Sequence, residues 1–249
     1  MKKLLGLIGY PLTHSFSQQY FSQKFKNEKI TGYEYRNFPI ANLDDFLVLL
    51  QQHPHIVGLN VTIPYKEKIL QYADYQDVIV TKIGATNTLL IDLDGKIKAY
   101  NTDVTGFFQS FVKHLKPHHQ KALILGTGGA SKAVAYVLNQ LKIPFYKVSR
   151  NPSNNQQIAY GDLNKNVMKE HQIIINTTPV GTFPAHHKKP TIPYEFIGSK
   201  HFFYDLVYNP EQTLFLKEAR KRGADFCNGL EMLKLQAEAA WQIWQKKSS

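Results

Sequence analysis

Lys66 is a side chain that could move a proton, if other residues of the sequence hold it in place. Lys66 follows a strand-like run in the stretch GLNVTIPYKEK, and Asp103 ends the stretch KAYNTD. An ammonium group can donate a proton to a developing alkoxide, and a neighbouring carboxylate can hold the lysine in place and share that proton. Both positions read as strand ends, where ligands of open α/β sheets bind. A lone lysine is more commonly a solvated surface residue, so the assignment depends on the remaining motifs.

A glycine-rich turn in the second half of the chain is suited to binding a dinucleotide. The stretch ALILGTGGASKAVAYVLNQL reads as a buried strand, a turn and an amphipathic helix. Gly126, Gly128 and Gly129 permit a tight turn and bring backbone N–H groups to a pyrophosphate at the positive end of the helix. A glycine turn alone is weak evidence, but here the strand before it and the helix after it are both present. The pattern is GxGGAxxA, a variant of the dinucleotide fingerprint.

The end of the next strand indicates which dinucleotide binds. NAD-binding chains usually place an acidic residue there, roughly 20 residues past the glycines, to hold the ribose 2′-hydroxyl. This sequence has Ser149, Arg150 and Asn151 instead. A carboxylate would repel a 2′-phosphate, whereas the Arg150 guanidinium can pair with it. The sequence therefore predicts NADP as the cofactor.

Strand-like and helix-like stretches alternate along the chain. The helix-like stretches, with apolar residues at 3.6-residue spacing, include 17–27, 42–52 and 130–142, a connecting helix from 104 that ends at Pro117, and a C-terminal helix over roughly 229–246. Apolar strand candidates are 4–9, 33–38, 56–62, 86–92, 121–126, 145–150, 172–178 and 202–208. This alternation predicts an α/β fold with mostly parallel sheets and a domain boundary near residue 103.

Composition and charge argue against several classes of protein. The net charge of +11 is concentrated after residue 103, and the lysines are scattered without basic runs, which disfavours a nucleic-acid partner. No apolar stretch approaches the roughly 20 residues of a membrane span. Cys227 is the single cysteine, which suits the reducing cytoplasm. The ten histidines lack metal-site spacing, so no metal is expected.

Nine motifs, in order from one end of the chain to the other, resemble those of the shikimate dehydrogenase family. They are GYPLTHSFSQQYF (9–21), NVTIPYKEK (60–68), GATNTL (84–89), NTDVTGF (101–107), GTGGASKA (126–133), VSRN (148–151), NTTPVG (176–181), DLVYNPEQT (205–213) and NGLEMLKLQA (228–237). The resemblance implies NADPH-dependent reduction of 3-dehydroshikimate to shikimate, in aromatic amino-acid biosynthesis. It also implies an N-terminal open α/β substrate domain (1–103), a C-terminal Rossmann-like NADP-binding domain (104–228) and a helix (229–249) that packs back on the first domain.

The resemblance assigns roles to individual residues. Lys66 and Asp103 match the family's catalytic pair, and the formal acid stays open between them. The substrate-binding positions are Ser15, Ser17, Thr62, Asn87, Tyr208 and Gln236. The cofactor-binding positions are Gly126, Thr127, Gly128, Gly129, Ala130, Ser149, Arg150, Asn151, Leu206 and Gly229.

The sequence departs from the family pattern at several places. Gln18 follows the second serine, where many members have proline. Asn154 stands where a second arginine is often found, which leaves Arg150 alone to hold the 2′-phosphate and predicts a smaller preference for NADP. Glu231 occupies a site that is often glycine.

Three alternatives follow from the sequence. A quinate/shikimate dehydrogenase of relaxed substrate or cofactor specificity is the nearest rival. A non-catalytic basic protein that binds nucleotide or nucleic acid is less well supported, because Lys66 and Asp103 are both present. Ser-x-Ser can also be a helix cap rather than a carboxylate site. The expected protein is a monomer or a homodimer.

Overall fold

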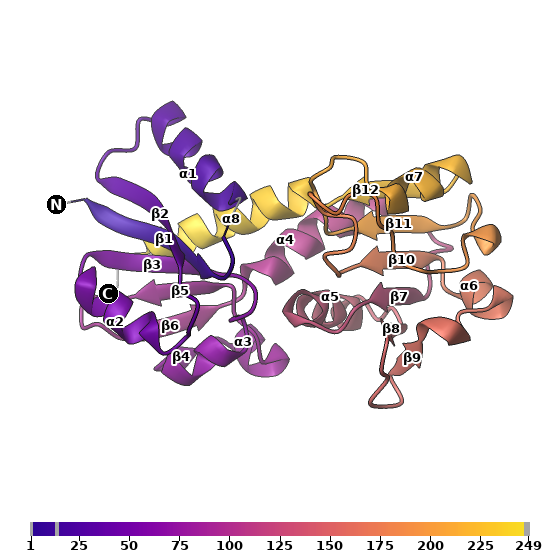
Figure 1. Cartoon of the computed structure of the whole chain (residues 1–249), viewed down its shortest axis with the longest axis horizontal. Coiled ribbons are helices and arrows are strands. Elements are labelled where there is room, and N and C mark those ends of the chain that lie inside the picture. Colours follow the sequence, from indigo (N-terminus) through magenta and orange to yellow (C-terminus); the bar gives the residue numbers. More distant parts are fainter. Residues whose placement is uncertain (1, 13–14, 247–249) are drawn as a thin grey trace. The chain divides into compact units, whose positions relative to one another are not determined.

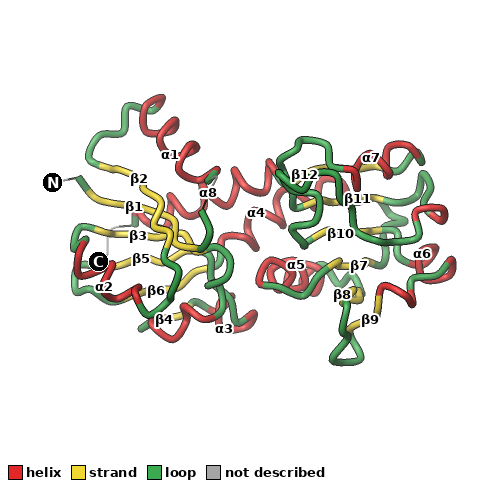
Figure 2. Tube along the Cα trace, in the orientation of Figure 1, coloured by secondary structure: helices red, strands yellow, loops and turns green. Residues whose placement is uncertain are grey.

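The chain forms two compact units in the computed structural model, which describes residues 2–12 and 15–246. Unit 1 comprises Met1–Thr105 and Gln236–Ser249, and unit 2 comprises Gly106–Leu235. The boundary therefore falls within two helices, α4 (Thr102–Phe111) and α8 (Leu230–Gln245). Figures 1 and 2 show the elements of each unit. The predicted C-terminal helix is confirmed.

Unit 1 is built on a six-stranded sheet in the order β2-β1-β3-β5-β6-β4. Its strands are β1 (Lys3–Gly9), β2 (Tyr33–Pro39), β3 (Ile56–Val61), β4 (Tyr75–Gln76), β5 (Thr88–Ile91) and β6 (Ile97–Tyr100). Its helices are α1 (Phe16–Asn27), α2 (Asp45–Gln52), α3 (Val78–Ile83) and a 3-10 turn, η1 (Lys68–Tyr72). The predicted first strand is confirmed, as β1.

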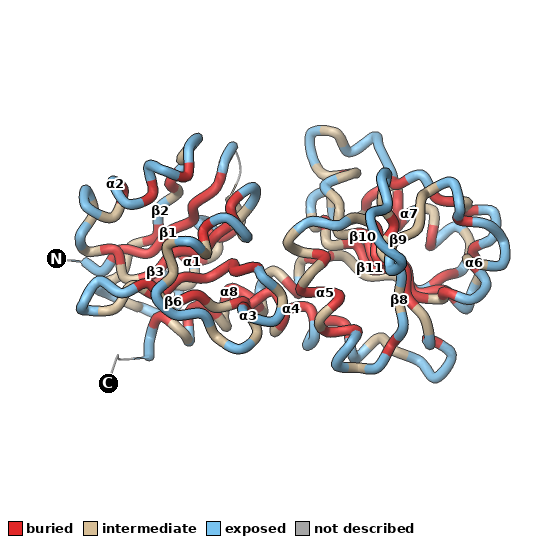
Figure 3. Tube along the Cα trace, turned by 90° about the horizontal axis from the view of Figure 1, so that it is seen from below, coloured by how far each residue is buried: buried red, intermediate tan, exposed pale blue. Residues whose placement is uncertain are grey.

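Hydrophobic cores lie on both faces of this sheet, because successive side chains of a strand point to opposite faces. Leu4 and Ile8 of β1 pack in a cluster with Phe46 of α2. Leu5 packs in the other cluster, with Trp244 of α8 and with α1. Buried segments follow the strands (red in Figure 3). Because both faces of the sheet are packed, the carboxyl ends of its strands are held in fixed positions.

Strand β5 runs antiparallel to both of its neighbours, β3 and β6, so the sheet of unit 1 is mixed. The cause is local. A short turn joins β5 to β6, in which the Asp92 carboxylate accepts hydrogen bonds from the backbone N–H groups of Asp94 (3.1 Å) and Lys96 (2.9 Å). A connection this short can join only antiparallel strands. The other pairs of the sheet are parallel.

Unit 2 contains a parallel sheet in the order β12-β11-β10-β7-β8-β9. Its strands are β7 (Ala122–Leu125), β8 (Phe145–Ser149), β9 (Gln157–Ala159), β10 (Ile173–Asn176), β11 (Phe202–Asp205) and β12 (Asp225–Asn228). Counted along the chain from β7, this is the order 3-2-1-4-5-6 of the Rossmann fold. The chain reverses direction across the sheet between β7 and β10, where dinucleotides bind.

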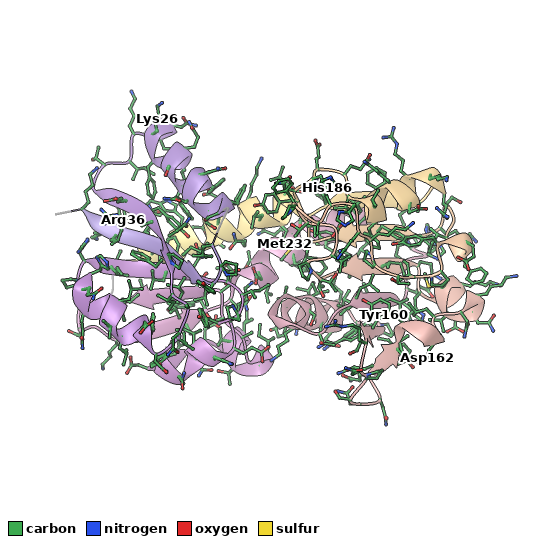
Figure 4. The ribbon with its side chains drawn as sticks, in the orientation of Figure 1. Lys26, Arg36, Tyr160, Asp162, His186 and Met232 are labelled. Atoms are coloured by element: carbon green, nitrogen blue, oxygen red, sulfur yellow. The ribbon has the colours of Figure 1, made fainter. Side chains whose placement is uncertain are left out.

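Helices cover both faces of this second sheet. They are α5 (Gly129–Gln140), α6 (Lys165–Glu170) and α7 (Leu214–Lys221), together with part of α4. Phe215 of α7 packs on Phe203, with ring centroids 4.6 Å apart, and Phe107 of α4 packs on Tyr204 at 5.1 Å. Short 3-10 turns connect the elements: η2 (Val112–His114), η3 (Tyr160–Asp162, both labelled in Figure 4) and η4 (Tyr194–Phe196).

The predicted connecting helix ends earlier than expected. It continues past α4 only through η2, and Leu115 is already extended, two residues before Pro117. A proline disfavours helical geometry in the residue before it, so the helix stops short of the proline. The predicted α/β class is confirmed. Within the described residues, none of the helices combines the length and apolar character that a bilayer crossing demands.

Candidate active site

Lys66 and Asp103 form an ion pair in unit 1. The Lys66 Nζ atom lies 2.6 Å from Asp103 Oδ2, and the two side chains are 17% and 9% exposed. Because both side chains are mostly buried, the ion pair keeps one geometry, unlike an exposed surface pair. A lysine fixed in this way keeps its ammonium group at one place, as a proton donor requires.

Two strand ends position this pair. Lys66 lies in the loop after β3, and its carbonyl accepts a hydrogen bond from Thr86 N at 2.8 Å, just before β5. Asp103 lies in the first turn of α4, directly after β6. Asn101 shapes that junction, because its Oδ1 accepts from Val104 N (3.2 Å) and its Nδ2 donates to the Ala85 carbonyl (2.9 Å).

Asn87 and Gln236 join the same site. The Asn87 Nδ2 group donates to Asp103 Oδ1 at 2.9 Å and lies 3.2 Å from Gln236 Oε1. Asp103 is therefore held on both oxygens, by Asn87 on one and by Lys66 on the other. The structure thus brings four of the predicted residues together from four separate segments of the chain.

Thr102 belongs to this cluster but is absent from the predicted site residues. It is 2% exposed, its backbone N–H donates to Asn87 Oδ1 at 2.7 Å, and its hydroxyl lies 2.9 Å from Asn87 Nδ2. The signal was present in the NTD motif, whose central residue is a threonine just before the carboxylate. Thr102 fixes the amide orientation of Asn87 and so the donor that faces Asp103.

The other substrate-binding candidates of unit 1 lie on neighbouring elements. Ser15 caps α1, since its side chain accepts from Gln18 N at 3.2 Å, while Ser17 is buried in the first turn. The helix-cap alternative is therefore correct for Ser15, although capping leaves its hydroxyl proton available to a ligand. Thr62 follows β3, and its backbone N–H donates to the Ile8 carbonyl at 2.9 Å. Thr13 and His14 of the same motif lie outside the described residues.

Tyr208 and Leu206 lie in unit 2, in the loop after β11. Burial raises the pKa of the Tyr208 hydroxyl. The start of this loop is held by Asp205, which is fully buried and accepts hydrogen bonds from Thr213 Oγ1 (2.6 Å) and Asn176 Nδ2 (2.9 Å). Burial raises the pKa of the Asp205 carboxyl to about 6, against the opposing effect of these hydrogen bonds. Asp205 thereby ties the loop to β10 and to α7.

The glycine turn of unit 2 has the shape that a pyrophosphate requires. Gly126 has φ +106°, and a Cβ there would meet Thr178 Cγ2 at 2.9 Å. Gly128 is the N-cap of α5, and a Cβ there would meet nothing within 4 Å. The space beside Gly128 is therefore open, and the first N–H groups of a 12-residue helix end beside it. Thr127, Gly129 and Ala130 complete this turn, and its residues fit a dinucleotide phosphate.

Two further cofactor candidates of unit 2, Gly229 and Leu206, lie against each other. A Cβ at Gly229 would approach the Leu206 carbonyl oxygen to 2.1 Å, so only glycine fits there. The backbone of the loop after β11 can then lie directly on the residue that precedes α8.

Arg150 lies at the carboxyl end of β8 with its side chain exposed. Asn151 N donates to Ser149 Oγ at 3.2 Å, which shapes the turn that presents the guanidinium. Burial raises the pKa of Tyr160, and the charge of Arg150 opposes that rise, so the two side chains are electrostatic neighbours. An exposed guanidinium at this strand end fits a 2′-phosphate.

Gly128→Ala is expected to weaken NADP binding by roughly tenfold or more, because the added methyl group occupies the space where a pyrophosphate approaches the helix. The unliganded protein should lose less than about 1 kcal/mol, because a Cβ meets no atom there and only the cap changes. Titration calorimetry with NADP and a thermal melt measure the two effects.

Gly198→Ala is the matched control, since a Cβ at Gly198 also meets nothing within 4 Å. It should bind NADP as the parent protein does. Unchanged NADP affinity in Gly128→Ala would contradict the phosphate role of this turn.

Two departures from the family pattern have structural partners. Gln18 accepts a hydrogen bond from Asn37 Nδ2 at 2.9 Å, which ties the first turn of α1 to β2. Glu231 pairs with Lys113, and both side chains are 48% exposed. An ion pair this exposed contributes little to stability.

Comparisons with known proteins agree on the kind of protein that this chain resembles. Residues 7–89 match the shikimate dehydrogenase substrate binding domain. The NADP-dependent shikimate dehydrogenase of Methanococcus vannielii is 36% identical, over 97% of this chain and 90% of that protein.

Solved structures extend the agreement to both units. The Thermus thermophilus shikimate 5-dehydrogenase, in complex with NADP(H) and shikimate, is 28% identical with a TM-score of 0.83, covering 98% of this chain and 94% of that one. The quinate dehydrogenase of Corynebacterium glutamicum, in complex with NAD, is 26% identical with a TM-score of 0.85, over the same shares of both chains.

The similarity therefore extends over nearly the whole chain rather than over one motif or one domain. It covers both the segment with the paired Lys66 and Asp103 and the segment with the glycine turn. The resemblance inferred from the nine motifs is confirmed: the chain belongs to the shikimate dehydrogenase family, whose members are oxidoreductases.

Proposed function

We propose that this enzyme reversibly reduces 3-dehydroshikimate to shikimate with NADPH, as a step of aromatic amino-acid biosynthesis in the cytoplasm. The observation that carries the proposal is the buried Lys66–Asp103 pair, joined by Asn87 and Gln236. Unit 1 would bind the substrate and unit 2 the dinucleotide. The names of the relatives support this division of labour, and the single cysteine suits a reducing compartment.

The protein's own residues supply the proton and the orientation. When bound, NADPH supplies the hydride. The Lys66 ammonium donates a proton to the alkoxide that develops at the substrate carbonyl, and its charge stabilises that oxygen. Asp103 keeps Lys66 at one position and can accept a hydrogen bond from a substrate hydroxyl. In the reverse direction the neutral amine of the same lysine takes the proton back.

The remaining residues would hold the two ligands. The hydroxyls of Ser15 and Ser17 donate to the substrate carboxylate, and Thr62, Asn87 and Gln236 bind its hydroxyl groups. Tyr208 matches a tyrosine that approaches the substrate. In unit 2 the turn at Gly126–Ala130 binds the pyrophosphate, and Arg150 with its neighbours Ser149 and Asn151 binds the 2′-phosphate. Leu206 and Gly229 are further dinucleotide-binding residues.

A near-ultraviolet absorbance assay tests the function. Shikimate and quinate would each be offered with NADP⁺ and with NAD⁺, and we expect turnover with shikimate and NADP⁺. Comparable turnover of quinate, or comparable use of NAD⁺, would instead support the relaxed relative, which the similarity to a quinate dehydrogenase makes a specific candidate. No turnover by folded protein that binds NADP would contradict the role of Lys66 and Asp103.

A further inference from the structure

Tyr35 has a buried hydroxyl whose position packing alone does not explain. It lies on β2 and is 4% exposed, whereas its neighbour Arg36 (labelled in Figure 4) points to solvent. The Tyr35 ring stacks on Phe21 at 4.7 Å and lies 6.3 Å from Trp244. A phenylalanine would make the same ring contacts. Since a buried hydroxyl needs a partner, the question is what this one holds.

Its partner lies close to the predicted catalytic residues. The Tyr35 hydroxyl donates to Asn60 Oδ1 at 2.8 Å. Asn60 is 4% exposed and lies near the end of β3, the strand that precedes Lys66. The tyrosine proton is therefore committed to a buried amide beside the predicted site.

Further hydrogen bonds connect Asn60 to Asp103. Its Nδ2 donates to Thr88 Oγ1 at 3.3 Å, and the Thr88 hydroxyl donates to Asn87 Oδ1 at 3.1 Å. Asn87 Nδ2 then donates to Asp103 Oδ1 at 2.9 Å. Every donor in this series points toward the Asp103 carboxylate. Hydrogen bonds aligned in one direction polarise one another, so each strengthens the next.

All members of the series are buried, so the loss of any one hydrogen bond is costly in free energy. Asn60, Asn87 and Thr88 are at most 4% exposed, and Asp103 is 6% exposed. In such surroundings a polar group left without its partner costs more than the bond itself contributes. Removing the first donor therefore disturbs the groups that follow it.

We propose that Tyr35 is a positioning residue of the reaction, which orients, through Asn60 and Thr88, the amide that holds Asp103. This inference rests on the proposed function. It adds a residue outside the motifs that indicate the family, on a strand that no assigned substrate or cofactor residue occupies.

Tyr35→Phe tests the first link of the series. We expect kcat to fall about three- to tenfold, with the KM for shikimate and the KM for NADP⁺ each within about threefold. The control is Tyr33→Phe on the same strand, whose ring packs on Trp241 at 4.9 Å. It should leave all three constants unchanged, and thermal melts should show both variants folded.

A double-mutant cycle separates positioning from general destabilisation. If Tyr35 acts through Thr88, then Tyr35→Phe combined with Thr88→Val should lower kcat about as much as Thr88→Val alone. A multiplicative effect of the two changes would overturn the inference. So would a Tyr35→Phe enzyme with the parent kcat.

Thr88→Val tests the other end, because it removes the hydroxyl between Asn60 and Asn87 with little change of volume. We expect kcat to fall about three- to tenfold and the KM for shikimate to change less. An unchanged kcat would overturn the link to Asp103. Failure of the parent enzyme itself to oxidise shikimate would overturn the proposed function instead, so the two failures are distinguishable.

Discussion

Replacing Lys66 with alanine is expected to lower kcat by about 10²- to 10⁴-fold, the usual contribution of a positioned general acid or base. The affinity for shikimate should stay within about tenfold, because the proposed hydroxyl and amide ligands remain in place. The backbone contact between the Lys66 carbonyl and Thr86 N also remains, so the loop keeps its course. Steady-state kinetics and equilibrium binding of shikimate measure the two effects.

The matched control is Lys68→Ala, two residues further on. Lys68 is exposed and begins the 3-10 turn η1, so its loss removes the same charge and a similar side chain outside the pair. It should leave kcat nearly unchanged. A Lys66→Ala enzyme that retains its turnover would show that another group moves the proton.

Arg150→Ala is expected to raise the KM for NADP⁺ by roughly 10- to 100-fold, since a charge-assisted hydrogen bond to a phosphate contributes about 1.5–3 kcal/mol. The KM for NAD⁺ should change less than about threefold, because NAD⁺ has no 2′-phosphate to lose a partner. Asn154 supplies no second cation, so the whole effect depends on one guanidinium. Kinetics with each cofactor at saturating shikimate measure the ratio.

Lys200→Ala serves as the control for charge alone. Lys200 is exposed in the same unit, near the amino end of β11 rather than at the carboxyl end of a strand. Its removal lowers the net positive charge equally but should leave the NADP⁺ to NAD⁺ ratio unchanged. Equal effects of Arg150→Ala on the two cofactors would contradict the assigned phosphate contact.

Features that depend on neighbouring residues were predictable from the sequence. Strand β1, helix α5 with the glycine turn before it, and helix α8 all lie where the apolar spacing places them. Short elements escaped this reading, because β4 has two residues and β9 has three, too few to show a period. The antiparallel course of β5 was also not foreseen, since the turn after it decides the direction.

The convergence of the candidate site depends on packing between distant segments. Asn87 and Gln236 are 149 positions apart, and no local pattern brings their amides within 3.2 Å. Family resemblance named both residues, but their contact with each other and with Thr102 follows from the way this part of α8 packs in unit 1. Tyr35 shows the limit more sharply, because it lies in no motif, and its hydroxyl gains a role only from what surrounds it.

The sequence by itself determined the class of fold, the family and the chemical types of the acting residues, because turn glycines, apolar periods and ordered motifs act over short stretches of chain. The tertiary structure alone decided which oxygen of Asp103 faces Lys66, that Ser15 caps α1, and that a series of buried hydrogen bonds connects Tyr35 to Asp103. The physical reason is that a buried polar group must find its partner wherever the packing of the sheet and its helices places one.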